Sequence, residues 1–207
     1  MREKGLGMDV NEEDALWFYR VASSKGDAIG LYSAGVMFLE GRGTDKNYNM
    51  AFQHFLYSAK NRDTPAGTYF YLGLCYEKGY GTDVNMALAI QNYEQSARMG
   101  DAAAKRNLGL CYLLGKGVKQ DSIKALYWTE QAAKGGDRLA FRHLGLMYMR
   151  GEGVPKDKNK ALLYLNEAAK RGDKYAQQVF DELSTSGWGA TLVKKLTEKM
   201  IEKLFDL

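Results

Sequence analysis

Small and apolar positions recur along the chain at a nearly fixed spacing. A motif of Leu-Gly, a tyrosine three residues later and then Gly-x-Gly occurs at Leu72–Gly81, Leu108–Gly117 and Leu144–Gly153, with a looser copy at Ala34–Gly43. The second glycines of successive copies are 38, 36 and 36 residues apart. Two further series keep the same period, namely Asp27, Asp63, Asp101, Asp137, Asp173 and Ala15, Ala51, Ala89, Ala125, Ala161. A period of this length is typical of a repeat protein.

Each repeat is predicted to contain two helices. The first begins at the Asp of the series, a good N-cap residue, and ends at Gly-x-Gly, because glycine accepts the left-handed backbone found at helix ends. The second begins about three residues before the Ala of the series and ends at the next Gly-Asp. Pairs of small residues in the second helix, such as Ala132 and Ala133, let helices approach closely, so we expect them to lie in the packed interior.

Three places depart from the regular repeat. The two extra residues of the longer step lie in Asp63-Thr-Pro-Ala-Gly, where a proline can open a helix. In the last repeat Asp181 replaces the glycine of Leu-Gly, which we call the motif glycine, and Ser184 replaces the tyrosine. A segment predicted to form a capping helix follows, and its apolar stripe holds Leu192, Leu196, Met200 and Leu204.

The predicted fold is therefore all-α, a single solenoid of stacked antiparallel helix pairs over residues 1–207. The chain begins inside a repeat, which indicates either a native half repeat or a piece of a longer array. The expected divisions are a partial repeat at 1–26, full repeats at 27–62, 63–100, 101–136 and 137–172, and a degenerate repeat with the capping helix at 173–207.

Composition narrows the possible functions. The 29 Lys and Arg residues against 25 Asp and Glu residues are scattered along the chain, so nucleic acid is not indicated as a partner. No apolar run approaches the roughly 20 residues that span a bilayer, so membrane insertion is not expected. Two cysteines, and no charged-then-apolar signal segment before Leu16, favour a reducing, cytoplasmic setting.

The residues that could carry chemistry do not form a catalytic or metal-binding pattern. Cys75 and Cys111 occupy one repeat position where other repeats have methionine, which favours core packing over a reactive thiol. His54 replaces an aromatic residue, and neither it nor His143 has a metal ligand at suitable spacing. Each Gly-x-Gly follows a helix, the reverse of a dinucleotide site. We therefore expect no cofactor and no enzymatic activity.

The stripe of the first helix that faces away from the core is predicted to line the concave wall of the solenoid, the usual binding surface of such proteins. Positions are counted here from the motif glycine. Position −3 holds Tyr32, Phe70, Arg106 and Arg142; position +4 holds Leu39, Glu77, Leu113 and Met149; position +5 holds Glu40, Lys78, Leu114 and Arg150.

Two interpretations of this stripe remain open. If the apolar residues are uncovered, they form a patch that marks an interaction site. The anchors would then be Tyr32, Phe70, Leu113 and Met149, and the groups binding partner carboxylates would be Arg106, Arg142 and Arg150. Alternatively, a tight superhelix covers these residues with adjacent first helices.

The motif Leu-Gly-x-x-Tyr-x-x-Gly-x-Gly-Val, followed by Asp, Ala with aromatic residues, Ala-Ala and Gly-Asp, resembles the Sel1-like repeat family. The likeness extends from about Gly5 to Gly189 and is most complete in 101–136 and 137–172. Tetratricopeptide repeats share part of the motif but have a period of about 34 residues and lack the Gly-x-Gly loop. The resemblance implies a right-handed α-solenoid that binds proteins or assembles complexes, commonly in bacterial or endoplasmic-reticulum settings.

The leading hypothesis is a non-enzymatic module that binds a protein or peptide in its concave groove, as an adaptor or as an inhibitor of a bacterial effector. The alternative is a structural protein that self-assembles through an open edge near Gly5. Some Sel1-like proteins have been named as β-lactamase candidates, but the Ser-x-x-Lys motif of such hydrolases does not occur in this sequence.

Overall fold

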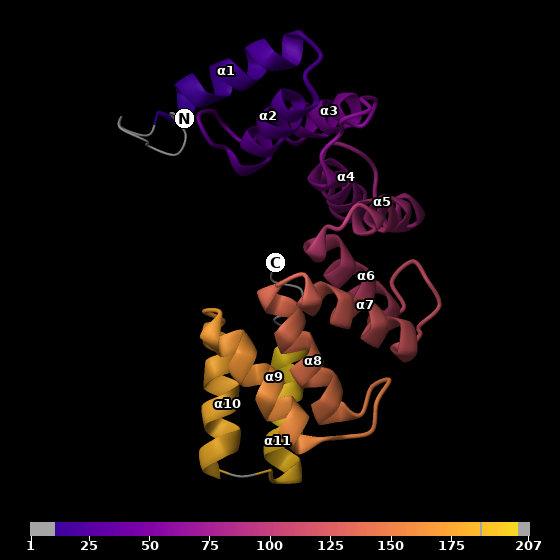
Figure 1. Cartoon of the computed structure of the whole chain (residues 1–207), viewed down its shortest axis with the longest axis vertical. Helices are drawn as coiled ribbons and strands as arrows, with labels where there is room; N and C mark the ends of the chain where they lie inside the picture. The colour runs from indigo at the N-terminus through magenta and orange to yellow at the C-terminus, as the bar shows by residue number, and fades with distance from the viewer. Residues whose placement is uncertain (1–10, 187, 203–207) are drawn as a thin grey trace. The chain divides into compact units, whose positions relative to one another are not determined.

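The computed structural model describes residues 11–186 and 188–202, and every regular element in these ranges is a helix (Figure 1). The chain divides into two compact units, residues 1–101 and 102–207. Unit 1 contains α1 (Glu12–Ser24), α2 (Ala28–Glu40), α3 (Tyr48–Ser58), α4 (Ala66–Lys78) and α5 (Met86–Arg98). Unit 2 contains α6 (Ala102–Leu114), α7 (Ser122–Lys134), α8 (Arg138–Arg150), α9 (Lys158–Lys170), α10 (Lys174–Ser186) and α11 (Ala190–Glu202). The all-α prediction is confirmed, while the right-handed sense and the single continuous array stay predictions.

The first helices begin where the Asp series predicts, with one exception. Asp27 and Asp137 accept hydrogen bonds from the backbone N–H groups three residues later, at 2.6 Å and 2.8 Å. Asp173 does the same for two N–H groups at the start of α10. The exception is Asp63, because the two inserted residues shift the N-cap of α4 to Pro65, the proline that the sequence indicated as a possible helix start, and Pro65 makes no side-chain capping bond.

The Gly-x-Gly loops do more than end a helix. The first glycines of three loops are left-handed C-caps, namely Gly41, Gly79 and Gly151. The second glycines of three loops also have positive φ, and a Cβ atom on each of these three would overlap the backbone that opens the second helix of the preceding repeat. These contacts pair Gly43 with Glu12, Gly81 with Tyr48, and Gly153 with Ser122. The loop therefore also allows two consecutive repeats to touch through their backbones.

The second helices begin three residues before each Ala of the series, as predicted. Four of these alanines have no exposed surface, namely Ala51, Ala89, Ala125 and Ala161. Each motif glycine receives a side chain from its partner helix: a Cβ on Gly73 would lie 2.6 Å from the Tyr93 ring, and one on Gly145 would lie 2.9 Å from Leu165. The motif glycine is thus required by the close approach of the paired helices.

Small residues in the second helices join them to the preceding first helices, as the pairs of Ala and Ser predicted. Ser58 Oγ donates a hydrogen bond to the Ala28 carbonyl at 2.9 Å, and Ser96 Oγ donates to the Ala66 carbonyl at 2.8 Å. Both serines are fully buried. Each hydroxyl therefore satisfies a carbonyl in the first turn of a neighbouring helix.

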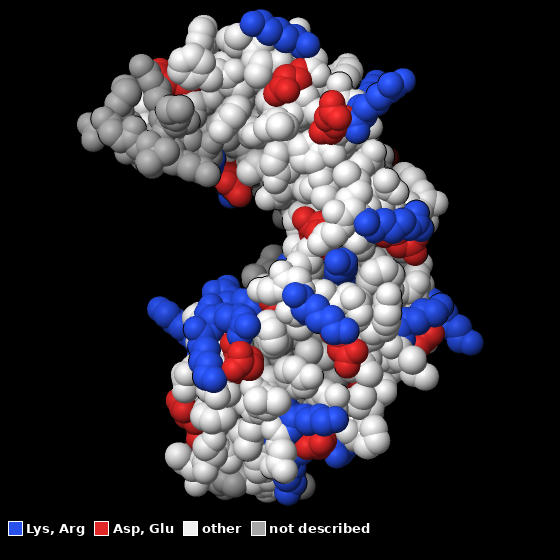
Figure 2. Space-filling model, in the orientation of Figure 1, with Lys and Arg blue, Asp and Glu red and all other residues white. Residues whose placement is uncertain are grey.

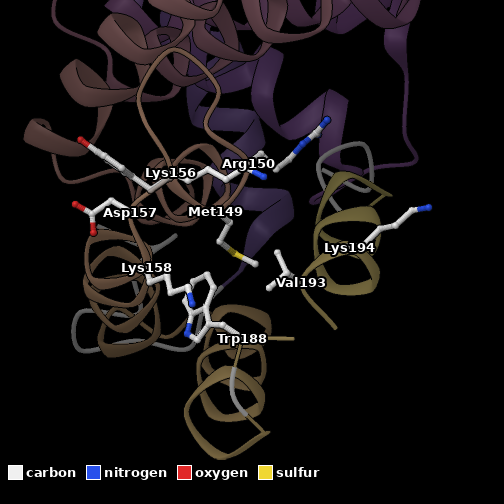
Figure 3. Close-up of a pocket in the computed structure, with 9 residues that line it drawn as sticks. Met149, Arg150, Lys156, Asp157, Lys158, Trp188, Val193 and Lys194 are labelled. Atoms are coloured by element: carbon white, nitrogen blue, oxygen red, sulfur yellow. The ribbon is translucent and has the colours of Figure 1, made fainter. Parts of the chain in front are cut away.

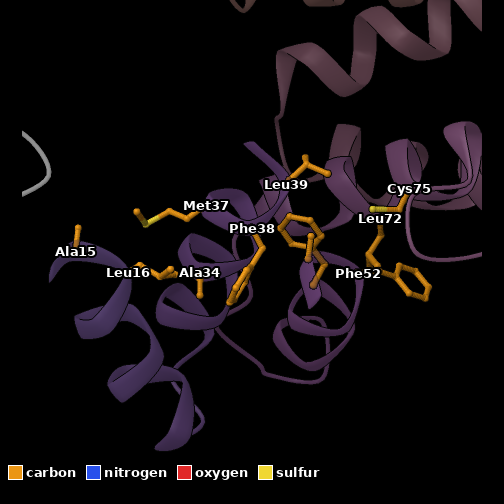
Figure 4. Packing of buried hydrophobic residues seen from close by; sticks show 11 residues of the cluster. Ala15, Leu16, Ala34, Met37, Phe38, Leu39, Phe52, Leu72 and Cys75 are labelled. Atoms are coloured by element: carbon orange, nitrogen blue, oxygen red, sulfur yellow. The ribbon is translucent and has the colours of Figure 1, made fainter. Parts of the chain in front are cut away.

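The core of unit 1 contains two residues from the row of Met and Cys that was predicted to pack in the core (Figure 4). Met37 and Cys75 are fully buried in one apolar cluster with Phe52 and Leu72. Burial raises the pKa of Cys75 to about 12, so its thiol stays protonated near neutral pH. In unit 2, Cys111 is also buried. Core packing is therefore the role of this row, as predicted.

The predicted capping helix corresponds to α11, which packs against α8. Leu196 is buried in the core of unit 2, and Leu192 packs against that core. The predicted stripe residue Leu204, the side chain of Met200 and the amino-terminal edge near Gly5 lie outside the described residues. Within the part of the chain that the structure describes, no helix is long and apolar enough to cross a membrane.

Candidate partner-binding surface

In unit 1, the aromatic residues predicted as anchors are half-buried parts of a ring cluster. Tyr32 lies 6.0 Å from the ring of Tyr71, and Phe70 lies 5.2 Å from the same ring. Burial raises the pKa of Tyr71 to about 12, with the nearby Tyr32 adding to the effect. The Tyr32 ring also fills the space beside Gly67, where a Cβ would approach its hydroxyl to 2.8 Å. Phe55 of α3 stacks on the Tyr71 ring at 5.1 Å, so the cluster joins α2, α3 and α4, while Tyr32 and Phe70 remain partly exposed.

The other predicted residues of unit 1 are engaged within the chain. Leu39 is buried in the apolar cluster of Figure 4. Glu77 accepts a hydrogen bond from the Tyr93 hydroxyl at 2.8 Å and forms an ion pair with Lys78 at 3.4 Å. Of the pair, Lys78 has the more exposed side chain, at 29% against 16%.

In unit 2, the two arginines at position −3 are not free cations. Arg106 pairs with Asp137 at 3.2 Å, and Arg142 pairs with Asp173 at 3.2 Å. Each pair joins the first helix of one repeat to the N-cap of the next first helix. The side chains of Arg142 and Asp173 are only 6% and 4% exposed. Both arginines, which the sequence suggested as groups binding partner carboxylates, therefore pair with carboxylates of the chain itself.

The Arg142 pair is buried but imperfectly hydrogen-bonded. Asp173 Oδ2 and Arg142 Nε have no well-directed hydrogen bond among the described atoms, although Nη1 lies 3.4 Å from Oδ1 in a hydrogen bond. Burial lowers the pKa of Arg142, and Asp173 opposes that shift. The neighbouring His143 is 2% exposed, and burial, reinforced by Arg106 and Arg142, lowers its pKa well below the usual range. This region is consequently structural, with a neutral histidine near neutral pH.

The +4 row of unit 2 is covered by its neighbours. Leu113 and Met149 are 6% and 3% exposed. Leu113 packs with Ala125 and Met147, and Met149 belongs to the cluster that includes Leu196 of α11. Of the two interpretations left open by the sequence, coverage by adjacent helices is the one found at this row.

Two of the predicted residues, Met149 and Arg150, nevertheless line a cavity in unit 2. It has a volume of about 410 Å³ and opens between the end of α8, the start of α9 and α11. Figure 3 shows Met149, Trp188 and Val193 pointing toward one another at its centre. We call it the α8–α11 pocket, and it is lined by Tyr148, Met149, Arg150, Lys156, Asp157, Lys158, Trp188, Val193 and Lys194.

The α8–α11 pocket has an apolar floor and a charged rim. Tyr148 and Met149 are buried, whereas Arg150, Lys156 and Lys158 are exposed. Lys158 Nζ lies 5.8 Å from the centre of the Trp188 ring, within reach of a cation–π contact. An apolar floor within a polar rim is the usual anatomy of a protein interface.

Among the described lining residues, the one carboxylate belongs to Asp157, which caps a helix. Asp157 Oδ1 accepts a hydrogen bond from the backbone of Lys160 at 3.0 Å and so caps α9. Just outside the lining, Glu152 pairs with Arg150 at 2.9 Å, and burial raises the pKa of Glu152. Among the described residues, the lining therefore carries four cationic side chains and one carboxylate, and Glu152 offsets the charge of Arg150.

Comparison with known proteins decides the family. The model of the Sel1 repeat matches residues 1–27, 28–63, 68–101, 102–137 and 142–173. The chain belongs to the Sel1 repeat family. Sel1 repeat proteins are generally protein-interaction modules, and their repeats are typically non-catalytic scaffolds. No curated protein matches the chain.

Solved Sel1 repeat structures resemble this one. A Sel1 repeat protein from Oxalobacter formigenes has 27% sequence identity and a TM-score of 0.80, over 98% of this chain and 82% of that one. A protective antigen present in uropathogenic Escherichia coli strains, displaying an SLR fold, has 24% identity and a TM-score of 0.74. The match covers 98% of this chain but 44% of the antigen, so this chain spans less than half of the antigen's length.

The Sel1 repeat pattern locates only part of the α8–α11 pocket. Met149 and Arg150 were found because they lie on the variable stripe of a first helix. Trp188 is the middle residue of the last Gly-x-Gly, where earlier repeats have Arg42, Tyr80, Lys116 or Glu152, and Lys194 lies in the cap, so neither belongs to the variable stripe of a first helix. Their contribution depends on α11 folding back against α8.

Proposed function

We propose that this Sel1 repeat chain is a non-catalytic module that binds a protein or peptide partner, and that unit 2 contacts the partner at the α8–α11 pocket. The supporting observation is the pocket itself, in which exposed cations surround a partly open apolar floor. Apolar side chains framed by charged ones allow a partner to bury an anchor while polar groups fix its orientation. Arg150 and Met149 keep the partner-binding role that the sequence suggested.

Tyr32, Phe70 and Lys78 form a second, weaker part of the proposal in unit 1. Their side chains are partly exposed, so a partner could contact the edge of the ring cluster without unfolding it. Arg106 and Arg142 are left out of direct contact in the proposal, because their side chains are only 12% and 6% exposed and pair with carboxylates of the next first helix.

Site-directed photo-crosslinking tests the proposal. A photoreactive amino acid is placed at Lys156, on the rim of the pocket, or at Lys119, an exposed loop position of the preceding repeat. In an extract of cells that produce the protein, we expect one discrete adduct from position 156 that is missing from position 119. Adducts that are identical at both positions, or absent from both, would contradict the proposal.

The same experiment separates partner binding from self-assembly. Self-assembly has its own support in Trp17, whose side chain on α1 is 59% exposed. An adduct with twice the mass of the chain would identify a second copy as the occupant and favour the structural role over the adaptor or inhibitor role.

A further inference from the structure

The floor of the α8–α11 pocket is suited to one large apolar side chain. Met149 from α8, Val193 from α11 and Trp188 from the segment between α10 and α11 converge on it (Figure 3). Its volume of about 410 Å³ lies in the lower part of the range for small-ligand sites, roughly 300–1,000 Å³. A side chain inserted here would touch an indole ring, a thioether and a branched aliphatic group at once.

The rim supplies positive charge from three directions. Arg150 comes from the end of α8, Lys156 and Lys158 from the loop and first turn before α9, and Lys194 from α11. Glu152 offsets the charge of Arg150, and the three lysines outnumber Asp157, the carboxylate among the described lining residues. Charge complementarity therefore favours an acidic occupant.

We propose that the α8–α11 pocket binds an acidic peptide segment of the partner protein, in which one aromatic or large aliphatic residue is flanked by Asp or Glu. The apolar side chain enters the floor formed by Met149, Trp188 and Val193. The flanking carboxylates meet Lys156 and Lys158 on one side and Lys194 on the other. This inference deepens the proposed function and rests on it.

A peptide fits these observations better than a nucleic acid. A nucleic-acid site needs cations along the path of the phosphates, and much of its affinity comes from them. On the face shown in Figure 2, basic and acidic side chains are interspersed. The four cations of the pocket instead surround one apolar floor.

Fluorescence anisotropy with synthetic peptides tests the chemistry directly. The probe is a labelled peptide with one phenylalanine between two runs of three glutamates, and the matched peptide has serine in place of phenylalanine. We expect the phenylalanine peptide to bind at least about tenfold more tightly, as burial of an aromatic side chain implies. The affinity should also fall as salt is added, because the rim lysines are exposed.

A pair of charge reversals locates the site. Lys158→Glu should weaken peptide binding by about tenfold or more, since it replaces attraction by repulsion at the pocket. Lys119→Glu makes the same change of net charge in the loop of the preceding repeat and should leave the affinity within about twofold. Unchanged helical circular dichroism and melting temperature in both variants show that the fold is retained.

Each other outcome would overturn the proposal. Equal affinity for the two peptides would refute binding through an apolar anchor. Equal effects of the two charge reversals would refute the α8–α11 pocket as the binding site. An oligonucleotide that binds as tightly as the peptide, and loses affinity in Lys158→Glu, would make the surface a general polyanion site. No peptide binding, together with a specific protein adduct at Lys156, would refute the acidic occupant alone and leave the proposed function standing.

Discussion

The buried ion pair between Arg142 and Asp173 gives the most direct test of how the repeats of unit 2 are joined. Asp173 has two roles, because its Oδ1 caps α10 through N–H groups at 3.0 Å and 3.1 Å while the carboxylate pairs with Arg142. Asp173→Asn keeps an oxygen for the cap but removes the charge. It therefore isolates the electrostatic role of the carboxylate.

The size of the effect follows from burial. Removing one partner of a buried ion pair typically costs about 3–5 kcal/mol, since the remaining charge is left without compensation. The incomplete hydrogen bonding of Arg142 and Asp173 places this pair at the lower end, so we expect Asp173→Asn to lower the free energy of unfolding by about 3 kcal/mol. Asp173→Ala should lose about 1 kcal/mol more, because the cap is also removed.

The Arg106–Asp137 pair provides a matched control in the same unit. Its side chains are 12% and 13% exposed, against 6% and 4% for the Arg142 pair. We expect Asp137→Asn to cost about 2 kcal/mol, between the values for exposed and buried pairs. The measurement for all variants is urea unfolding followed by helical circular dichroism, with the slope compared to detect a change of mechanism.

A double-mutant cycle tests whether the loss of stability in Asp173→Asn comes from the Arg142 guanidinium that is left buried without a carboxylate. Tyr32 and Phe70 occupy the position of Arg142 in earlier repeats, so Arg142→Phe is a substitution that the repeat already uses. The double variant Arg142→Phe with Asp173→Asn should be more stable than Asp173→Asn alone. If Asp173→Asn costs less than about 1 kcal/mol, or if the two changes are simply additive, the reasoning is wrong.

Two further predictions concern a loop glycine and a buried histidine. Gly153→Ala should destabilise by about 2 kcal/mol more than Gly136→Ala in thermal melts, because both have positive φ but only Gly153 would press a Cβ against the neighbouring repeat; equal losses would refute the repeat contact. The pKa of His143 in the folded state lies below its unfolded value of about 6.5, so the unfolded state binds more protons. The stability that depends on His143 is therefore complete above about pH 6.5 and is lost as the pH falls below 6.5. The loss is at most about 1.4 kcal/mol per pH unit. Between pH 7.5 and 5.5, His143→Gln should flatten this dependence of the melting temperature, whereas His54→Gln, at a ring hydrogen-bonded to its own helix, should retain it; the same slope in both variants would contradict the assignment.

The sequence by itself determined the repeats, the two helices of each repeat and most of their ends. These features depend on signals that act over a few residues: an Asp accepts N–H groups in the next turn, and a glycine permits left-handed backbone wherever it stands. Pro65 shows the limit of the Asp series taken alone, because the series indicates Asp63 as the cap whereas the two inserted residues place Pro65 at the start of α4. The alanine and glycine positions also predicted the close helix contacts, since only small residues fit there.

Only the tertiary structure decided what the variable stripe does. An arginine on a helical wheel looks like an exposed cation, but Arg106 and Arg142 each meet an aspartate 31 residues further along, which stacking of the repeats brings into contact. Leu113 and Met149 are covered for the same reason. The α8–α11 pocket depends on α11 returning to α8, a contact between helices that are far apart in the sequence. Burial and charge pairing at such positions depend on neighbours that are distant in the sequence. The sequence pattern therefore predicted which face of the first helices varies, and the packing determined which side chains on that face remain accessible.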